Sequence, residues 1–135
     1  MLPPRRDLTI ERPAIFVIDD EYEALADVVC ASERATVGIR LLWEEIKRAV
    51  IVPAAQAPSD LVRMGAHIHL TDLTKREQRR VKLVFPHEAT EPSRISVARS
   101  LGAALIGLRA GDRFAWRDGQ AQLRAVRVNR VETPA

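Results

Sequence analysis

The 135-residue sequence contains a single cysteine, Cys30, and only six aromatic side chains. A lone thiol cannot form an internal disulfide or supply a cysteine-based zinc site. No apolar run approaches the ~20 residues that a transmembrane helix needs, and the first residues lack the apolar core of a signal peptide. We therefore expect a cytoplasmic protein that makes no membrane contact.

Lysine is also scarce, because arginine supplies 18 of the 21 basic side chains. Arginine forms planar, bidentate contacts with carboxylate and phosphate groups that lysine cannot reproduce. The charges are divided unevenly along the chain: residues 1–62 contain seven basic and eleven acidic side chains, whereas residues 63–130 contain fourteen basic and six acidic ones. This division predicts two functional parts, of which the basic one has the charge to meet nucleic acid or an acidic protein surface.

A short strand and a helix are predicted at the start of the acidic half. The apolar run at residues 14–18 has the composition of a buried strand, and residues 1–18 are assigned to a leader and this strand. Asp20 and Glu23 have the spacing of a capping box, and apolar residues then recur with helical period. These patterns predict a helix over about residues 20–31.

A second helix is predicted after a short connection at residues 32–36. Its apolar stripe includes Leu42 and Ile46, and we expect it to end near Val52, before a proline. Two helices joined by so few residues lie antiparallel, because the loop cannot return the chain in any other way. Residues 19–52 are therefore predicted to form a helical hairpin, a short coiled coil.

A change of hydrophobic period marks the second half of the chain. Residues 53–59 contain two prolines and little apolar bulk, which is typical of a linker. Beyond it the period changes from 3.6 to 2, which predicts half-buried antiparallel strands near residues 64–70 and 80–85 and a short third strand near residues 95–97. We expect a second domain over residues 60–132.

One short helix and a hairpin complete the predicted second domain. Ser100 is expected to cap the helix, which would end at Gly107. The Asp-Gly pair at residues 118–119 is a strong hairpin signal, and a shift in the apolar phase of the return strand predicts a β-bulge near residues 125–126. The chain is thus predicted to be an α+β protein, in which a helical hairpin is followed by an antiparallel sheet domain with one short helix.

Four segments of the second domain follow one another in a characteristic order. They are Leu83-Val-Phe-Pro86, Ile95-Ser-Val97, Gly102-Ala-Ala-Leu-Ile-Gly107 and Gly111-Asp112. Together with the preceding hairpin they make the chain resemble the GreA/GreB transcription-factor family over residues 13–131, and most closely its short-armed Rnk branch. The resemblance implies an FKBP-like C-terminal domain that docks on bacterial RNA polymerase at the rim of its secondary channel, with the hairpin at or in that channel.

The resemblance also implies a polymerase-docking loop, made by Ser96, Arg99, Ser100 and Leu101. Family members usually have Ser-Pro or Ala-Pro where this chain has Arg99-Ser100. The loop therefore loses the fixed φ of a proline and gains a charge. We expect docking through this loop to be altered.

The tip of the predicted hairpin carries Glu33 beside Arg34. Cleavage-stimulating relatives have two acidic residues at the tip of a long hairpin, positioned to help hold a catalytic magnesium ion of the polymerase. A helix of about 13 residues rises only ~20 Å. We therefore expect a regulator that competes with long-armed factors and does not stimulate transcript cleavage. The alternative is a transcript-cleavage elongation factor.

Other chemistry-bearing residues point to no enzyme. His67 and His69 share one strand face with the spacing of metal ligands, but no third ligand has a suitable position. The acidic residues within 19–27 crowd the first turns of a helix, where the helix dipole favours negative charge. We predict no catalytic residue, no cofactor and no bound metal.

The densest basic cluster consists of Lys75, Arg76, Arg79 and Arg80, on either side of a turn. No aromatic side chain lies among them to stack on a base, and no known RNA- or DNA-binding motif is present. The favoured interpretation is a solvated loop. The alternative for this cluster is a contact with phosphate or with an acidic protein surface. For the basic second domain as a whole, the alternatives are a weak contact with nucleic acid or a basic nucleic-acid-binding module.

Overall fold

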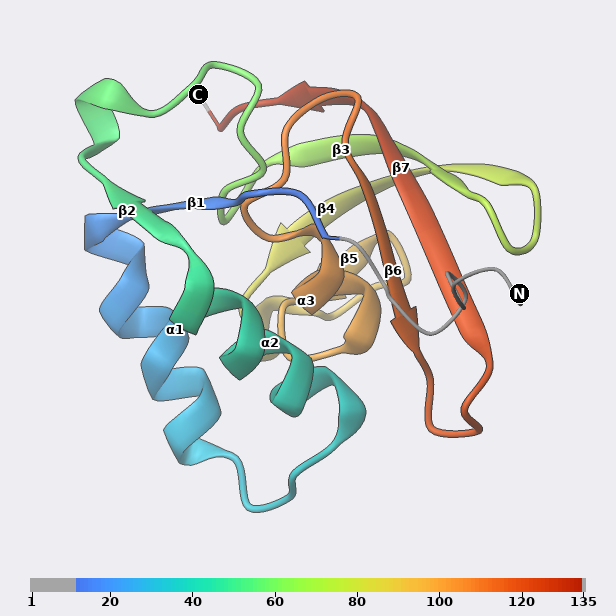
Figure 1. Cartoon of the computed structure of the whole chain (residues 1–135). Coiled ribbons are helices and arrows are strands. Elements are labelled where there is room, and N and C mark those ends of the chain that lie inside the picture. Colours follow the sequence, from blue (N-terminus) through green and yellow to red (C-terminus); the bar gives the residue numbers. More distant parts are fainter. Residues whose placement is uncertain (1–11, 135) are drawn as a thin grey trace, which may run out of the picture.

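The computed structural model describes residues 12–134 and contains three α-helices and a curled sheet (Figure 1). The sheet has five strands in the order β5-β4-β3-β7-β6, and a further pair of strands has the order β1-β2. The helices are α1 (Asp19–Ala31), α2 (Val37–Arg48) and α3 (Ser100–Leu105), with 3-10 turns η2 (Ala54–Gln56) and η3 (Pro86–Glu88). The strands are β1 (Phe16–Ile18), β2 (Val50–Val52), β3 (His67–Asp72), β4 (Glu77–Val84), β5 (Arg94–Ser96), β6 (Arg113–Arg117) and β7 (Leu123–Glu132).

The helix α1 begins directly after β1, where the first helix is predicted, but it is not capped as predicted. Its N-cap is Ile18, and no side chain bonds to the first turn from that position. The capping box expected from Asp20 and Glu23 is therefore wrong, because both residues already lie inside the helix. Instead, Oδ1 of Asp19 accepts the backbone N–H of Asp20 at 2.8 Å.

The helix α2 ends earlier than the sequence predicts. Thr36 caps its start, since its Oγ1 accepts the backbone N–H of Ile39 at 3.2 Å. The helix stops at Arg48 rather than near Val52, and the following residues form β2, which pairs in parallel with β1. The physical reason is local composition, because the run Val-Ile-Val of β2 is β-branched and favours a strand when a partner strand is available.

The helical segment shares one hydrophobic core with the sheet. Ile15, Leu25 and Leu42 are buried in the same cluster as the apolar side chains of the sheet and α3. Polar contacts add to this packing, since Oε1 of Glu21 on α1 accepts the backbone N–H of Met64 at 3.0 Å. The helix α2 packs mainly against α3, so the predicted arm does not stand free of the rest of the chain. The division into separate domains at residues 53–59 stays a prediction.

The strands β3 and β4 are antiparallel, as predicted, with Ile68 opposite Val81. The predicted third strand is present as β5, but it pairs with β4 in parallel, with Leu83 opposite Ile95. The expectation of a wholly antiparallel sheet is therefore wrong at this edge. The chain between β4 and β5 passes through η3 and is long enough to bring the third strand back in the same direction. The likeness to FKBP domains stays a prediction.

The hairpin of β6 and β7 is present, but its turn and its irregularity differ from the predicted ones. Asp118 and Gln122 close a longer loop, in which the backbone N–H of Asp118 donates to the carbonyl oxygen of Gln122 at 3.0 Å. No bulge occurs near residues 125–126, because β6 and β7 pair there in regular register. The irregularity lies between β3 and β7, where the register shifts and Asn129 is the extra residue. The predicted bulge assumes that Leu123 is a buried residue of the strand, whereas its side chain is exposed.

The two faces of the sheet differ in character. The inner face packs against α3 and carries the buried side chains Ile68, Leu70, Val81, Leu83, Phe114 and Val126. The outer face carries mostly charged and polar side chains, because strand residues alternate between the faces. Within residues 12–134, no helix is long and apolar enough to cross a bilayer.

Candidate functional site

A mainly apolar groove of about 1190 Å³ lies where the turn between α1 and α2 meets the segment around η3 and the loop before α3. We call it the docking groove. It is lined by Ala24, Asp27, Val28, Ala31, Ser32, Thr36, Val37, Gly38, Ile39, Phe85, Pro86, His87, Ala89, Ser96, Ala98, Arg99 and Ser100. Three of the four predicted docking residues therefore face one groove. The fourth, Leu101, is half-buried and packs against the core instead.

The backbone of the docking loop packs closely against a glycine of α2 and a glycine of α3. A β-carbon on Gly38 of α2 would overlap the carbonyl oxygen of Ala98 and lie 2.8 Å from the backbone nitrogen of Ser100. A β-carbon on Gly102 of α3 would likewise overlap the carbonyl oxygen of Ser96. Only glycine permits these approaches, so the position of the loop depends on the packing of both helices.

Hydrogen bonds fix the backbone of this loop. Ser96 is buried, and its Oγ accepts the backbone N–H of Ala98 at 3.1 Å. The backbone N–H of Arg99 donates to the carbonyl oxygen of Ser96 at 3.0 Å. The predicted capping role of Ser100 is wrong, because Arg99 occupies the N-cap and makes no side-chain cap bond. The exposed Arg99 side chain thus extends from a rigid backbone.

The tip residues lie in the connection between α1 and α2, at one end of the docking groove. Glu33 and Arg34 are both exposed. Ser32 donates from its Oγ to the carbonyl oxygen of Arg34 at 2.8 Å, and its side chain lines the groove together with Thr36. The tip and the docking loop, more than 60 residues apart in sequence, therefore border one concave surface. Sequence reasoning missed this, because no local pattern reports contact between them.

The groove combines an apolar floor with few charged side chains. Its wall carries one acidic and one basic side chain, Asp27 and Arg99, around an apolar floor. The ring of His87 stacks on Phe85 with the centroids 6.5 Å apart. Within the described part of the chain, no three His, Cys, Asp or Glu side chains come together where they could hold a metal ion.

Comparison with known proteins identifies the family. The family model "Transcription elongation factor, GreA/GreB, C-term" matches residues 57–133, more than half of the chain. The chain belongs to the GreA/GreB family. It is 31% identical over 111 residues to the regulator of nucleoside diphosphate kinase of Escherichia coli K12, covering 79% of this chain and 80% of that protein. It is 37% identical over 114 residues to the transcription elongation factor GreA of Rhodospirillum rubrum, covering 77% and 73% of the two chains.

A solved structure supports the assignment at the level of the fold. The prokaryotic transcription elongation factor GreA/GreB from Nitrosomonas europaea superimposes with a TM-score of 0.70 at 25% sequence identity. The match covers 90% of this chain and all of that one. This GreA/GreB-family chain is therefore a Rnk-like or GreA-like transcription factor with mixed helix and sheet content.

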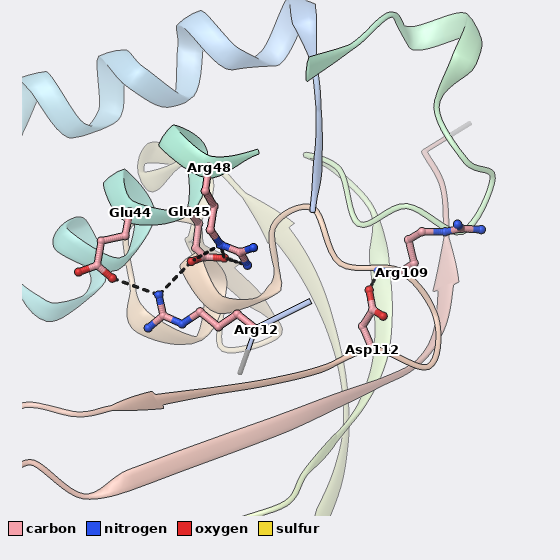
Figure 2. Close-up of polar contacts among 6 residues, drawn as sticks. All are labelled: Arg12, Glu44, Glu45, Arg48, Arg109 and Asp112. Atoms are coloured by element: carbon pink, nitrogen blue, oxygen red, sulfur yellow. Dashed lines mark hydrogen bonds and ion pairs between the residues drawn. The ribbon is translucent and has the colours of Figure 1, made fainter. Parts of the chain in front are cut away.

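The Gly111-Asp112 pair of this GreA/GreB-family chain has a structural role. The backbone N–H of Gly111 donates to the carbonyl oxygen of Val128 at 2.7 Å, which ties the turn to β7. Oδ2 of Asp112 accepts the backbone N–H of Arg109 at 2.8 Å (Figure 2). The Nε of Arg109 in turn donates to Oδ1 of Asp60 at 2.9 Å. The motif thus links β7, the turn at Arg109 and the segment around Asp60.

Glu45 of α2 is a buried carboxylate held by two arginines. Glu45 is fully buried, and its oxygens accept hydrogen bonds from Arg12 at 3.0 Å and from Arg48 (Figure 2). Arg12 also reaches Glu44 at 3.1 Å and lies over the ring of Phe114, 4.9 Å from its centroid. Sequence reasoning did not find this cluster, because Glu45 lies at an ordinary helical position.

The predicted basic cluster does not form one surface in the GreA/GreB-family fold. Lys75 and Arg76 lie in the turn between β3 and β4, while Arg79 and Arg80 are adjacent strand residues and so point to opposite faces. Arg80 alone belongs to the outer face, where its Nη2 lies 3.4 Å from Oε2 of Glu132. The four basic residues, adjacent in the sequence, therefore lie on different surfaces of the structure.

The predicted histidine pair also lies on the outer face. The Nε2 of His69 is 3.0 Å from Oε1 of Glu132, and His67 pairs with the same strand residue across the sheet. The hydrogen bond from His69 lowers the pKa of Glu132 below its usual 4.5, with further lowering by the charges of Arg80 and Arg130 and an opposing effect of desolvation. His69 is therefore hydrogen-bonded to Glu132, and His67 lies beside them on the same polar face.

Proposed function

We propose that this GreA/GreB-family factor binds bacterial RNA polymerase through the docking groove and acts there as a non-enzymatic regulator of transcription. Factors of this family act on bacterial RNA polymerase. The observation that carries the proposal is the meeting of the docking loop and the arm tip at a single groove. A groove of this size with an apolar floor and a charged wall accepts side chains of a partner protein.

The short arm supports regulation without transcript cleavage. The helix α1 has 13 residues and rises about 20 Å. Because α2 packs against α3, the tip remains close to the body of the protein. Magnesium coordination requires carboxylate oxygens at about 2.0–2.1 Å, or one water further away, so a tip that falls short contributes little. The one tip carboxylate, Glu33, also has the cation Arg34 as its neighbour.

Competition with long-armed factors follows if both kinds of factor bind the same part of the polymerase. The polymerase-bound fraction of each would then depend on its concentration and affinity, and this chain would inhibit cleavage stimulated by the other. The polymerase itself would be left with its intrinsic cleavage rate. The alternative, a cleavage factor in its own right, predicts a rate above the intrinsic one when this chain is present alone.

The proposed docking is tested by measuring binding of the full chain to core RNA polymerase. Arg99→Glu reverses the charge at the groove wall, and it leaves the hydrogen bonds that hold the loop intact because none of them uses the Arg99 side chain. Arg40→Glu is the matched control, since Arg40 is exposed on α2 and lies outside the docking groove. We expect Arg99→Glu to weaken binding about tenfold or more, as loss of an interfacial charge contact does. Equal affinity of both variants would contradict docking through the groove.

A cleavage assay on a backtracked complex tests the second part of the proposal. We expect no stimulation by this chain alone and a concentration-dependent inhibition of a long-armed factor, relieved by excess of that factor. Stimulation above the intrinsic rate would favour the cleavage-factor alternative. Failure to inhibit when the polymerase is saturated with this chain would contradict a shared docking position.

A further inference from the structure

The outer face of the five-stranded sheet collects basic side chains from four strands. We call this surface the basic face. Strand pairing places Lys82 opposite Arg94, Arg80 and Arg130 on either side of His69, and Arg127 opposite Arg113. Its cationic members are Arg80, Lys82, Arg94, Arg113, Arg117, Arg127 and Arg130.

Few acidic side chains balance this charge. Glu132 is the one carboxylate at an outer-face position of the paired strands among residues 12–134, and it is already engaged by His69, Arg80 and Arg130. A second carboxylate, Glu91, reaches Arg94 from a neighbouring loop at 3.2 Å. The side chains of Arg80 and Arg130 remain 57% and 71% exposed. Most of the positive charge of the basic face is thus available to a partner.

The arrangement is unfavourable for the isolated sheet. Like charges directly opposite each other on neighbouring strands destabilise the pairing, and the basic face contains two such pairs, Lys82 with Arg94 and Arg113 with Arg127. A solvated face that needed only solubility would alternate charge sign across the strands. An external anion would relieve the repulsion, because it lies between the cations and neutralises them together.

The composition of the face indicates which polyanion fits. Six of its seven cations are arginines, whose planar forks bind phosphate oxygens in bidentate fashion. The aromatic side chains of β6, Phe114 and Trp116, are buried on the inner face and cannot stack on unpaired bases. Single-stranded nucleic acid, which depends on such stacking, therefore fits poorly. Contacts with the phosphates of a regular duplex require no stacking.

The dimensions agree with a duplex. Five strands spaced by about 4.8 Å span roughly 19 Å, which exceeds the ~12 Å width of the DNA major groove. One face can therefore reach phosphates on both sides of a groove. We propose that the basic face binds the phosphate backbone of double-stranded DNA without reading its sequence. This surface is separate from the docking groove, since the groove is lined by α1, α2, the segment around η3 and the loop before α3.

Fluorescence anisotropy of the full chain with a labelled DNA duplex of about 20 base pairs tests the proposal. The variant is Arg113→Gln with Arg130→Gln, which removes two exposed cations of the basic face. The control is Arg34→Gln with Lys47→Gln, which removes two exposed cations of the helical segment outside the basic face. Log affinity against log salt concentration has a slope of about −0.9 per phosphate contact, so the face variant should lose up to about 2 units of slope. We expect it to bind at least tenfold more weakly at moderate salt, and the control to bind within about threefold of the parent.

Several results would overturn the proposal. An equal loss of affinity for DNA in the control variant would assign the effect to net charge. Equal or tighter binding of a single strand of the same length would contradict the preference for a duplex. Displacement of the duplex by polyglutamate at the same charge concentration as effectively as by unlabelled DNA would assign the face to an acidic protein. Both variants replace charge by an uncharged side chain, and thermal unfolding verifies their folding. Binding to core polymerase should survive in the face variant, which separates this surface from the docking groove.

Discussion

Gly38 of α2 faces the backbone of Ala98 so closely that a β-carbon at residue 38 would overlap the carbonyl oxygen of Ala98. The start of α2 and the docking loop therefore form one rigid unit. This contact explains how the start of α2 determines the position of a loop far along the chain. It also makes Gly38 the position at which the smallest substitution should have a large effect.

Gly38→Ala should destabilise the protein. Overpacking at a closed contact costs about 1–3 kcal/mol, and the better helix propensity of alanine offsets up to about 1 kcal/mol of this. Gly119→Ala is the matched control, because a β-carbon there would meet only Val37 at 3.9 Å. Urea unfolding of both variants measures the difference. Equal free energies of unfolding would mean that the loop yields easily and that the docking groove is not rigid.

Leu42→Ala should destabilise the protein by about 2–5 kcal/mol, because Leu42 is fully buried in the shared core. Trp43→Ala, one residue further along α2, should have a much smaller effect, since 40% of Trp43 is exposed. The comparison uses chemical unfolding monitored by circular dichroism, which does not depend on the tryptophan. A change below about 0.5 kcal/mol for Leu42→Ala would contradict the packing of α2 onto the core.

Arg12→Ala and Arg48→Ala should each lower the free energy of unfolding, because each removes hydrogen bonds to the carboxylate of Glu45. Hydrogen bonds to a charged group contribute about 1.5–3 kcal/mol, and the partial exposure of both arginines places each loss at the lower end. The double variant should lose more than the sum, because it leaves the buried carboxylate of Glu45 without a cation. A double-mutant cycle measures the coupling. Additive losses would mean that water already compensates the charge of Glu45.

Stability should depend on the ionisation of Glu132. The folded-state pKa of Glu132 lies below its usual 4.5, because of the hydrogen bond from His69 and the charges of Arg80 and Arg130. A lowered folded-state pKa adds stability above the unfolded-state value and loses it as the pH falls through the folded-state value. The melting temperature of the parent should therefore exceed that of Glu132→Gln near neutral pH and approach it in acid. A difference that is constant between about pH 3 and pH 7 would contradict this role.

Local signals in the sequence predicted much of the fold. The helical period around Leu25 and Leu42 located α1 and α2, and the alternation around Ile68 and Val81 located β3 and β4. These predictions succeed because the side chains of one face of an element recur at a fixed spacing, which the sequence displays directly. The family motif at Gly111-Asp112 likewise lies in one short segment and was found without the fold.

Pairings between distant segments were not predictable in the same way. No pattern in residues 50–52 indicates that they pair with residues 16–18. The parallel direction of β5 depends on the path of the chain between β4 and β5. The docking groove was missed for the same reason, since its walls come from four segments. The basic face was also hidden, because its arginines are scattered over four strands and only the register brings them together.

The parallel pairing of β1 with β2 determines where the helical segment could be lengthened. It holds both ends of the helical segment side by side, because Phe16 lies opposite Val50 and the neighbouring residues pair in the same register (Figure 1). The other end, residues 32–36, lies beyond the contacts that Gly38 makes with the docking loop. Whole helical turns inserted there would lengthen the helical segment and move the groove wall formed by Ser32 and Thr36, while leaving the pairing of β1 with β2, the core and the contact of Gly38 with the docking loop as they are. Insertions at the tip can thus change how far the helical segment reaches without changing how it is attached to the rest of the protein.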